Sequence, residues 1–410
     1  MSLIINATLV GIALLFGMLP VLMTACLKYR LRQLAKRTRT DAYCPPVAVV
    51  VPCKGLDPGF KENIQSLLDQ DYSALELLFV VAADDDPAYP ALQEVLRQSA
   101  PNGKSSRASL LVAGFSGSRA QKLTNQLAAI RQASAESRVL VFVDSDCRPD
   151  PGFVGRLVSP LNDAGIGATT GYRWYHPPKL TLGSLLRSTW NAGALPFLVD
   201  PKRVFAWGGA MAIRRETFER AGIAVAWNNA VSDDMTLTVA VRRLGLALRF
   251  VPECIAVSYE SSTLAETLEF TNRQSLISRV YFPPLWWGTA IGHALANVLM
   301  LYGLASLGLW VHTDNPAFLL GFACALLLPI QLANAAWLFG SARDLLPATV
   351  REELERRRWY YVLAAPLASI MTLLNTVHSA TTRRMMWRGV QYELRSPTET
   401  IVVTAQQATA

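Results

Sequence analysis

Clusters of acidic residues lie far apart along the chain, and two of them directly follow apolar runs. Residues 84–86 are three aspartates that follow the run 77–81, and Asp144 and Asp146 follow the run 139–143. Short uncharged runs of this kind are typical of buried strands. Carboxylates at the ends of such strands lie where open α/β sheets bind ligands. An Asp-x-Asp pair there suits Mg²⁺ or Mn²⁺ holding a diphosphate, because these cations prefer a few carboxylate oxygens together with phosphates. This chemistry indicates transfer from a sugar nucleotide.

A third acidic cluster, Asp233 and Asp234, directly follows Ser232. Local capping explains it fully, since a serine N-cap and acidic residues in the first turn stabilise a helix. Alternatively, one of the carboxylates acts as a general base that removes a proton from an acceptor hydroxyl. A base needs reach to that hydroxyl and a tuned pKa. Taken alone, this cluster leaves both interpretations open.

Alternating strands and helices predict the sheet that positions these clusters. Strands separated by amphipathic helices imply parallel pairing with right-handed crossovers. We therefore expect an α/β fold with a Rossmann-like, mostly parallel sheet. The predicted strands are 47–52, 77–81, 109–113, 139–143, 166–172, 206–213 and 247–251.

The chain is unusually apolar, with a mean hydropathy of +0.24 and only 17% charged residues over its 410 residues. The apolarity is concentrated in stretches of a length suited to crossing a bilayer. We therefore expect an integral, multi-pass membrane protein. The stretches are 3–27, 285–311, 316–341 and 359–376, of which the last contains Pro366.

Basic residues set the expected topology. They follow the first stretch from Lys28 onward, whereas the start lacks the positive region of a cleaved signal peptide, so an uncleaved anchor is favoured. The region that follows is then cytosolic, in a membrane that we expect to be a bacterial inner membrane. Arginines on both sides of 359–376 disfavour a full crossing there. Pro366 suggests a re-entrant or interfacial segment instead.

The net charge of +8 does not indicate a nucleic-acid partner. Much of the excess lies beside the apolar stretches, where lysine and arginine attract anionic lipid headgroups. No basic stripe is interleaved with stacking aromatic residues. The six cysteines and four histidines have no metal-type spacing.

Taken together, these motifs resemble the inverting glycosyltransferases of family 2, of the GT-A type, and most closely their ceramide glucosyltransferase-like branch. The resemblance covers about residues 45–282. It is carried by the stretches 52–58, 76–87, 142–146, 208–215 and 232–234.

The resemblance implies roles for particular residues. Asp234 would be the general base, and Asp144 and Asp146 would hold a divalent metal, Mg²⁺ or Mn²⁺, with the donor diphosphate. Asp86 would contact the uridine part of a UDP-sugar. The nucleotide-binding candidates are Asp86, Lys54, Lys122 and Asp144.

One departure from the family pattern concerns the end of the catalytic block. Relatives commonly have Gln or Arg, two residues, and then Arg-Trp. Here Arg273 and Gln274 open the matching register, but Leu276 and Ile277 replace Arg-Trp. Arg279, one helical step away, is the candidate cation for the leaving diphosphate. Because polymerising relatives use the Arg-Trp pair near the acceptor chain, its loss favours transfer of a single sugar.

The expected activity is transfer of one hexose from a UDP-sugar to a lipid hydroxyl, with a ceramide-like acceptor favoured. Transfer to a polyprenyl phosphate or a polysaccharide is an alternative, and a catalytically silent nucleotide-binding scaffold is an alternative of another class. Protein partners are not indicated.

The expected segments are an N-terminal transmembrane anchor (1–28), a basic linker (29–44), a GT-A catalytic domain (45–263), an amphipathic interfacial helix (264–284), a membrane region with two full spans and the re-entrant or interfacial segment (285–378), and a cytosolic tail, basic and then disordered from about Ser396 (379–410).

Overall fold

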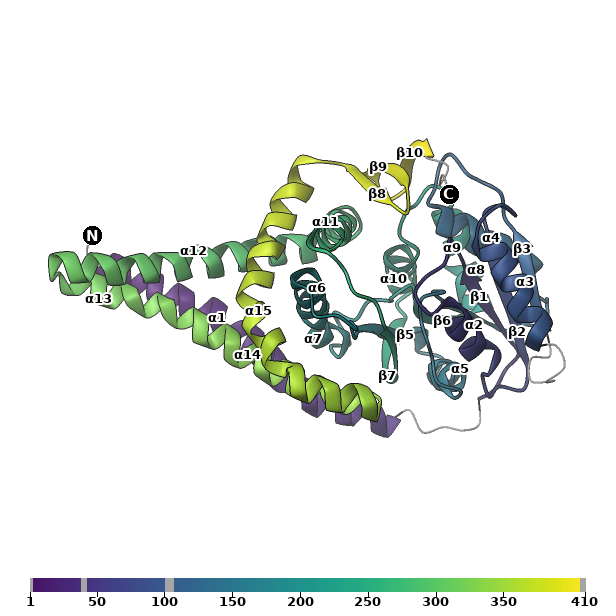
Figure 1. Ribbon diagram of the computed structural model, residues 1–410, viewed down its shortest axis with the longest axis horizontal. Helices are drawn as coiled ribbons and strands as arrows, with labels where there is room; N and C mark the ends of the chain where they lie inside the picture. Colours follow the sequence, from purple (N-terminus) through teal and green to yellow (C-terminus); the bar gives the residue numbers. More distant parts are fainter. Residues whose placement is uncertain (1–2, 38–42, 100–106, 406–410) are drawn as a thin grey trace. The chain divides into compact units, whose positions relative to one another are not determined.

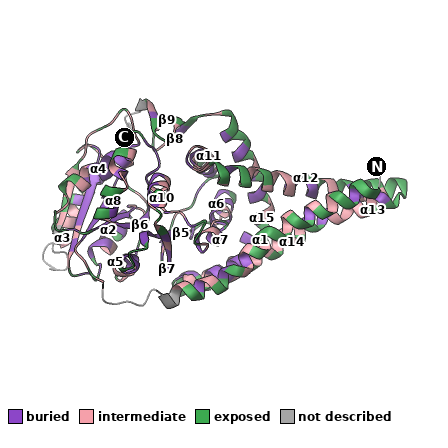
Figure 2. Cartoon of the chain, turned by 180° about the vertical axis from the view of Figure 1, so that it is seen from behind, coloured by how far each residue is buried: buried purple, intermediate pink, exposed green. Residues whose placement is uncertain are grey.

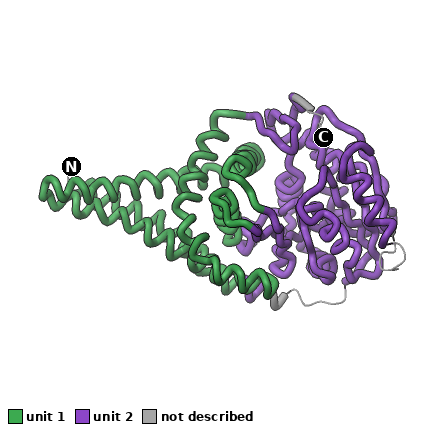
Figure 3. Tube along the Cα trace, viewed as in Figure 1, with its two compact units in different colours: residues 1–30, 179–196, 261–382 green, residues 31–178, 197–260, 383–410 purple. Residues whose placement is uncertain are grey.

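The computed structural model describes residues 3–37, 43–99 and 107–405. The chain divides into two compact units (Figure 3). Unit 1 comprises Met1–Arg30, Lys179–Pro196 and Ser261–Thr382, and unit 2 comprises Leu31–Pro178, Phe197–Glu260 and Arg383–Ala410.

Unit 2 is built on a seven-stranded, mostly parallel sheet (Figure 1), which confirms the expected α/β fold class. The strand order is β3-β2-β1-β4-β6-β5-β7, and only β6 runs antiparallel to its neighbours. The strands are β1 (Val47–Pro52), β2 (Leu75–Val81), β3 (Arg107–Val112), β4 (Val139–Val143), β5 (Ile166–Tyr175), β6 (Ala210–Arg214) and β7 (Ala247–Ser258).

Helices follow most of these strands, as the alternating pattern predicts. They are α2 (Phe60–Leu68), α3 (Ala88–Ser99), α4 (Gln121–Gln132), α5 (Phe153–Val158), α8 (Arg215–Arg220), α9 (Ile223–Trp227) and α10 (Asp233–Arg243), with a 3₁₀ turn at Ser159–Asn162. The helix α7 (Leu195–Leu198) runs from unit 1 into unit 2.

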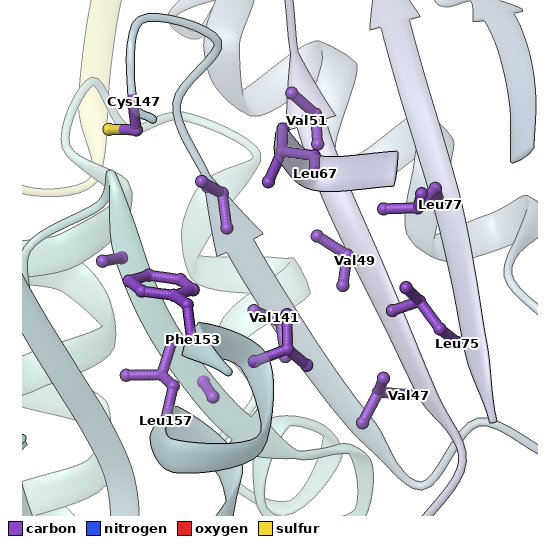
Figure 4. Packing of buried hydrophobic residues seen from close by; sticks show 14 of the residues in the cluster. Val47, Val49, Val51, Leu67, Leu75, Leu77, Val141, Cys147, Phe153 and Leu157 are labelled. Atoms are coloured by element: carbon purple, nitrogen blue, oxygen red, sulfur yellow. The ribbon is translucent and has the colours of Figure 1, made fainter. Parts of the chain in front are cut away.

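The central strands are buried on both faces, which explains why they appear in the sequence as continuous apolar runs. Figure 4 shows one of these faces, where Val49 and Val51 of β1 lie near Leu67 of α2. On the same face, Phe153 and Leu157 of α5 pack beside β4, and both are at most 1% exposed.

Two strand boundaries differ from the expectation. Predicted strand 206–213 begins only at Ala210, because residues 206–209 form a turn with two adjacent glycines. Predicted strand 247–251 continues to Ser258, although Pro252 would normally end a strand. The pairing of β5 with β7 shifts register between Thr170 and Tyr172, and this irregularity accommodates the proline.

The expected disorder beyond about Ser396 is wrong. The end of the chain forms a three-stranded antiparallel sheet of β8 (Arg384–Trp387), β9 (Val390–Ser396) and β10 (Glu399–Ala405). Tyr392 and Leu394 alternate with polar residues and are 2% and 0% exposed. This period-2 burial is the signature of a half-buried strand that the polar composition obscures.

Unit 1 is helical. Among the residues that the structure describes, four helical segments are long and apolar enough to cross a membrane: Leu3–Leu34, Pro283–Thr313, Pro316–Leu345 and Ala348–Thr381. Figure 2 shows extensive exposed surface along these helices. The exposed apolar side chains include Leu15, Val311 and Leu363. Large exposed apolar surfaces of this kind suit contact with lipid. The helices are α1 (Leu3–Arg37), α6 (Leu182–Ala192), α11 (Leu264–Tyr281), α12 (Pro283–Thr313), α13 (Pro316–Phe322), α14 (Leu327–Ala342) and α15 (Ala348–Thr381), with 3₁₀ turns at Ala323–Leu326 and Arg343–Leu345.

Pro366 does not break the last helix, contrary to the expectation of a broken, re-entrant segment. α15 continues through Pro366 for 34 residues. Apolar helices tolerate an internal proline because neighbouring groups can satisfy the freed backbone carbonyl. Whether α15 crosses the membrane or lies at its interface stays a prediction. The expected amphipathic helix 264–284 corresponds to α11, which opens with a capping box between Thr263 and Glu266.

Candidate active site

The carboxyl end of β4 places Asp144 and Asp146 at the edge of the sheet of unit 2. The preceding β4 residues are fully buried, whereas both aspartates are partly exposed. The backbone N–H of Asp144 donates to the carbonyl of Gly209, 3.3 Å away, in the turn that precedes β6. A side chain on Gly209 would collide with the Asp144 carboxylate and the Trp207 ring, so only glycine permits this approach.

Asp144 is held between two cations. Its Oδ1 lies 2.8 Å from Nζ of Lys122, and its Oδ2 lies 3.2 Å from a guanidinium nitrogen of Arg173. Burial would raise the pKa of Asp144, but Lys122 and then Arg173 outweigh burial and hold the pKa below its ordinary value. Asp144 is therefore a carboxylate at neutral pH.

Arg173, on β5, also binds Asp146, with 2.6 Å between the guanidinium and Oδ1. It is only 9% exposed, and its guanidinium lies 5.2 Å from the centre of the Trp207 ring. A cation over an aromatic face gains further stabilisation there. Arg173 was not among the expected site residues, because the predicted strand 166–172 ended one residue before it. The available signal was a charged residue in a run that otherwise reads as buried, since buried arginines are almost always paired.

Lys122 connects Asp144 to the third acidic cluster. Its Nζ lies 3.0 Å from Oδ2 of Asp233, and the same oxygen accepts a hydrogen bond of 2.8 Å from the Gln126 amide. Burial would lower the pKa of Lys122, but Asp144 and Asp233 together raise it above its ordinary value. The expected proximity of Lys122 to a nucleotide stays a prediction. What the structure shows is a cation that bridges two carboxylates.

Replacing Lys122 by methionine should destabilise unit 2. The change leaves Asp233, whose side chain is 5% exposed, without its cation. Removing one partner of a buried ion pair costs about 3 kcal/mol or more, which corresponds to a fall of roughly 6–12 °C in the unfolding midpoint of a domain of this size. Thermal unfolding of the detergent-solubilised protein measures the fall. Adding Asp233→Asn should recover part of it, and an additive loss in the double variant would contradict the bridging role.

Asp234 has a different environment from Asp233. Its Oδ2 accepts a hydrogen bond of 3.2 Å from the N–H of Gly208, and its Oδ1 accepts bonds from the Ser232 hydroxyl and the N–H of Met235. Burial, and then the neighbouring Asp233 charge, raise the pKa of Asp234 to about 6. The Ser232 hydroxyl also accepts a hydrogen bond from the N–H of Met235. Ser232 therefore caps the helix while the neighbouring Asp234 has a raised pKa, so the two interpretations of this cluster are compatible.

Asp86 and Lys54 lie on neighbouring loops. Oδ1 of Asp86 accepts bonds of 2.8 Å from Gly55 N–H and 2.9 Å from Ala88 N–H, which ties the loop after β1 to the start of α3. Burial lowers the pKa of Lys54, and Arg388 lowers it further. The aspartates at 84 and 85 are exposed, in line with solvated loop residues.

Asp57 and Arg388 complete the cluster, and neither was expected. The Arg388 guanidinium lies 2.9 Å from Oδ1 of Asp57, while Oδ2 of Asp57 accepts a bond of 2.9 Å from the Ser145 hydroxyl. Burial would lower the pKa of Arg388, but Asp57, Asp146 and Asp144 raise it, in that order of strength. Cations and carboxylates therefore alternate along this edge of the sheet.

The three candidates on α11 belong to unit 1. Arg273 lies over the Phe270 ring, 5.3 Å from its centre. Arg279 donates to the carbonyls of Ser379 and Thr382, where α15 ends. The role of Gln274 stays a prediction. The residues that replace Arg-Trp, Leu276 and Ile277, are 1% and 8% exposed, so they serve packing within unit 1.

The donor atoms suit a hard cation only when a ligand adds further oxygens. Within the residues that the structure describes, no three acidic, histidine or cysteine side chains group closely enough to hold a metal by themselves. Asp144 and Asp146 offer carboxylate oxygens, the donor type that Mg²⁺ and Mn²⁺ prefer. A metal shared with substrate phosphates fits this pair, because such cations usually bind one or two carboxylates plus phosphate oxygens.

Two of the solved structures that this chain matches contain a nucleotide or nucleotide sugar with Mn²⁺. The mannosyltransferase PcManGT from Pyrobaculum calidifontis, in complex with GDP-Man and Mn²⁺, is 19% identical, with a TM-score of 0.47, over 91% of this chain and 98% of that one. Glucosyl-3-phosphoglycerate synthase from Mycobacterium tuberculosis, in complex with Mn²⁺, UDP and glucosyl-3-phosphoglycerate, is 20% identical, with a TM-score of 0.38, over 60% of this chain and 83% of that one.

Sequence comparison gives the family. An N-acetylglucosaminyltransferase from Bradyrhizobium diazoefficiens is 25% identical over 245 residues, which cover 54% of this chain and 46% of that relative. The chain thus matches less than half the length of this relative. The sequence model of glycosyl transferase family 21 matches residues 12–400. Its number differs from the family 2 of the resemblance, but both are glycosyltransferases. With nearly its whole length matched, this chain belongs to glycosyl transferase family 21.

Proposed function

We propose that this glycosyltransferase moves a single hexose from a UDP-sugar to the hydroxyl of a membrane lipid, with a ceramide-like acceptor favoured. The contrast between two carboxylates carries the proposal. Asp144 is held ionised between Lys122 and Arg173, whereas the pKa of Asp234 is raised to about 6. Carboxylates whose environments push their pKa values apart suit different catalytic roles. The resemblance to the ceramide glucosyltransferase-like branch and the apolar helices support the lipid acceptor.

In the proposed reaction, Asp144 and Asp146 would hold a divalent cation, which would help to bind the donor diphosphate. Such a cation, when bound, neutralises charge that develops on the departing UDP. Asp234 accepts the proton of the attacking hydroxyl. The hydroxyl oxygen forms a bond to the anomeric carbon as the bond from that carbon to the diphosphate breaks, which inverts the configuration. Oδ2 of Asp86 would accept a hydrogen bond from the uridine, since Oδ1 accepts from the N–H groups of Gly55 and Ala88.

The membrane segments give the proposed location. The basic residues after the first span support a cytosolic location for unit 2 by the positive-inside rule, and the acceptor headgroup would then approach from the cytosolic leaflet. Trp287 is exposed beside the buried Trp286, so it suits the headgroup level, where it would anchor the helix.

The raised pKa of Asp234 predicts the acidic limb of the rate profile. A general base works only when deprotonated, so transfer should fall as the pH drops through about 6, and not near the ordinary aspartate value of 3.8. Initial rates at saturating UDP-sugar between pH 5 and 8 measure the limb. Binding of the intact UDP-sugar over the same range is the control, since its diphosphate keeps two negative charges there and its affinity should change little. A constant rate down to pH 5 would contradict the assignment.

Incubation of membranes with labelled UDP-sugars, followed by mass analysis of the lipids, tests the proposed function. UDP-glucose and UDP-N-acetylglucosamine belong in the panel, the latter because a relative carries that activity in its name. The expected product is a lipid bearing one sugar, in line with Leu276 and Ile277 replacing Arg-Trp. A ladder of products would indicate a polymerase, a labelled polyprenyl phosphate would indicate the phosphate acceptor, and UDP binding without turnover would indicate a silent scaffold.

A further inference from the structure

The turn between β8 and β9 brings an arginine from the end of the chain to the carboxylates of the candidate site. Arg388 pairs with Asp57, a residue 331 positions earlier in the sequence. The contact is reciprocal at the backbone, because Arg388 donates to the carbonyl of Lys54 and the Lys54 ammonium donates to the carbonyl of Arg388. The charge of Arg388 also acts on Asp144 and Asp146.

The turn has a conformation that arginine seldom adopts. Trp387 pairs with Val390, so Arg388 and Gly389 form a two-residue hairpin loop, and their φ values are 47° and 77°. Such loops favour Asn, Asp or Gly at the first position because φ is positive there. A residue with a Cβ carries a cost of about 1–2 kcal/mol in this region. An arginine at this point is therefore explained by what its side chain contacts and not by the turn.

Contacts other than Arg388 hold the hairpin in place. The hydroxyl of the buried Tyr392 accepts a bond of 3.3 Å from the N–H of Gln121, at the start of α4. The N–H of Val402 donates to the carbonyl of Gly117, 3.3 Å away, in the segment before α4. The residue after Gln121 is Lys122, which bridges the site carboxylates. The small sheet is thus docked on the helix that carries a site residue, and it presents Arg388 from there.

Charge balance suggests what Arg388 binds. In the structure, the carboxylates of Asp57, Asp144 and Asp146 pair with Arg388, Arg173 and Lys122, but Arg173 also pairs with Glu260 and Lys122 with Asp233. Carboxylates therefore outnumber cations among these ion pairs, which favours entry of a divalent cation together with the diphosphate of a nucleotide sugar, a dianion whose charge the cation cancels. The carboxylates then face the cation and the arginines face the phosphates. A guanidinium suits phosphate because its planar fork forms two parallel hydrogen bonds.

We propose that Arg388, presented by the C-terminal hairpin, binds the diphosphate of the sugar-nucleotide donor. This inference rests on the proposed function, and it assigns to the hairpin the cation that the sequence analysis sought on α11. Arg279 is engaged by the carbonyls of Ser379 and Thr382. Arg388 pairs with Asp57, and the charges of Asp146 and Asp144 also act on it, so its guanidinium lies beside the carboxylates that would hold the cation and the donor diphosphate.

Nucleotide binding to the detergent-solubilised full chain tests this role. R388Q should weaken UDP binding about 10- to 100-fold at fixed Mn²⁺, because a hydrogen-bonded ion pair contributes about 1.5–3 kcal/mol. Uridine, which lacks phosphates, should bind as it does to the parent. R395Q is the matched control, since Arg395 lies on the same sheet and its side chain pairs with Glu393 and Glu399 of that sheet. It should leave UDP binding unchanged.

Each other outcome has a distinct meaning. An equal loss of UDP and uridine binding, or an unchanged UDP affinity, would overturn the proposal, and tighter UDP binding by R388Q would identify the hairpin as a plug instead. R388K keeps the charge without the fork and should still weaken UDP binding several-fold, which preserves the test if R388Q does not fold. A parent that prefers GDP would refute only the UDP-sugar donor, and the same comparison then runs with GDP and guanosine.

Discussion

Replacement of Asp234 by asparagine should lower transfer by about 10²- to 10⁴-fold, the range that general-base catalysis contributes. Asparagine keeps one oxygen, which can accept from the N–H of Gly208 or from the N–H of Met235, although not from both, since these donate to different oxygens of Asp234. It cannot take a proton from the acceptor hydroxyl. Because the change leaves Asp144 and Asp146 intact, UDP affinity in the presence of Mn²⁺ should stay within about twofold of the parent value, since those carboxylates hold the metal. Initial rates with labelled donor and a separate UDP titration measure the two effects.

The neighbouring carboxylate supplies the matched control. Asp233→Asn removes a buried charge that pairs with Lys122, while the asparagine oxygen can still accept from the Gln126 amide, so it should lower the unfolding midpoint more than Asp234→Asn does. It should retain more transfer activity, because Asp234 keeps its place. Removing the Asp233 charge should also lower the pKa of Asp234, which moves the acidic limb of the rate profile to lower pH. Parent-like turnover by Asp234→Asn would refute its role as base and favour a phosphate acceptor, which needs no strong base.

The sequence predicts those parts of the site that depend on local pattern. Asp144 and Asp146 could be placed because they directly follow a buried strand, and Asp234 because a cap and an acidic pair mark the start of a helix. Arg173 and Asp57 could not be placed in the same way. Their roles depend on which strands become neighbours. Arg173 of β5 contacts Asp144 at the end of β4 because a single strand, the antiparallel β6, lies between β4 and β5 in the sheet. Nothing local in the sequence encodes that pairing.

The C-terminal hairpin shows a different kind of failure. The polar composition after Ser396 favoured disorder, because few apolar residues there can offset the entropy of ordering. The burial needed is small, however, and Tyr392 and Leu394 provide it on one face of β9. The available signal for a hairpin was Gly389, which lies between two segments in which apolar and polar residues alternate. The docking of this hairpin on α4 is a tertiary contact, so the proximity of Arg388 to Asp57 was beyond sequence reasoning.

Replacement of Asp146 by alanine should abolish the metal dependence of UDP binding. Asp146 binds Arg173 at 2.6 Å, and it is half of the carboxylate pair that suits a metal shared with phosphates. With Mn²⁺ present, the variant should bind UDP more weakly than the parent, and transfer should fall about 10²- to 10³-fold, the loss typical of removing one group that stabilises a developing negative charge.

The same variant should behave differently when the metal is chelated. Without Mn²⁺, the carboxylate of Asp146 repels the diphosphate. When this carboxylate is removed, Arg173 still pairs with Asp144 and Glu260, and it can also bind the incoming phosphates. UDP should therefore bind to Asp146→Ala at least as tightly as to the parent in chelator, although it binds more weakly in Mn²⁺. This reversal separates a metal-holding carboxylate from one that merely supports the fold, whose loss would weaken binding in both conditions. Calorimetric titrations of UDP with and without Mn²⁺ measure it, with Asp69→Ala, an exposed carboxylate of unit 2, as the control that should change neither.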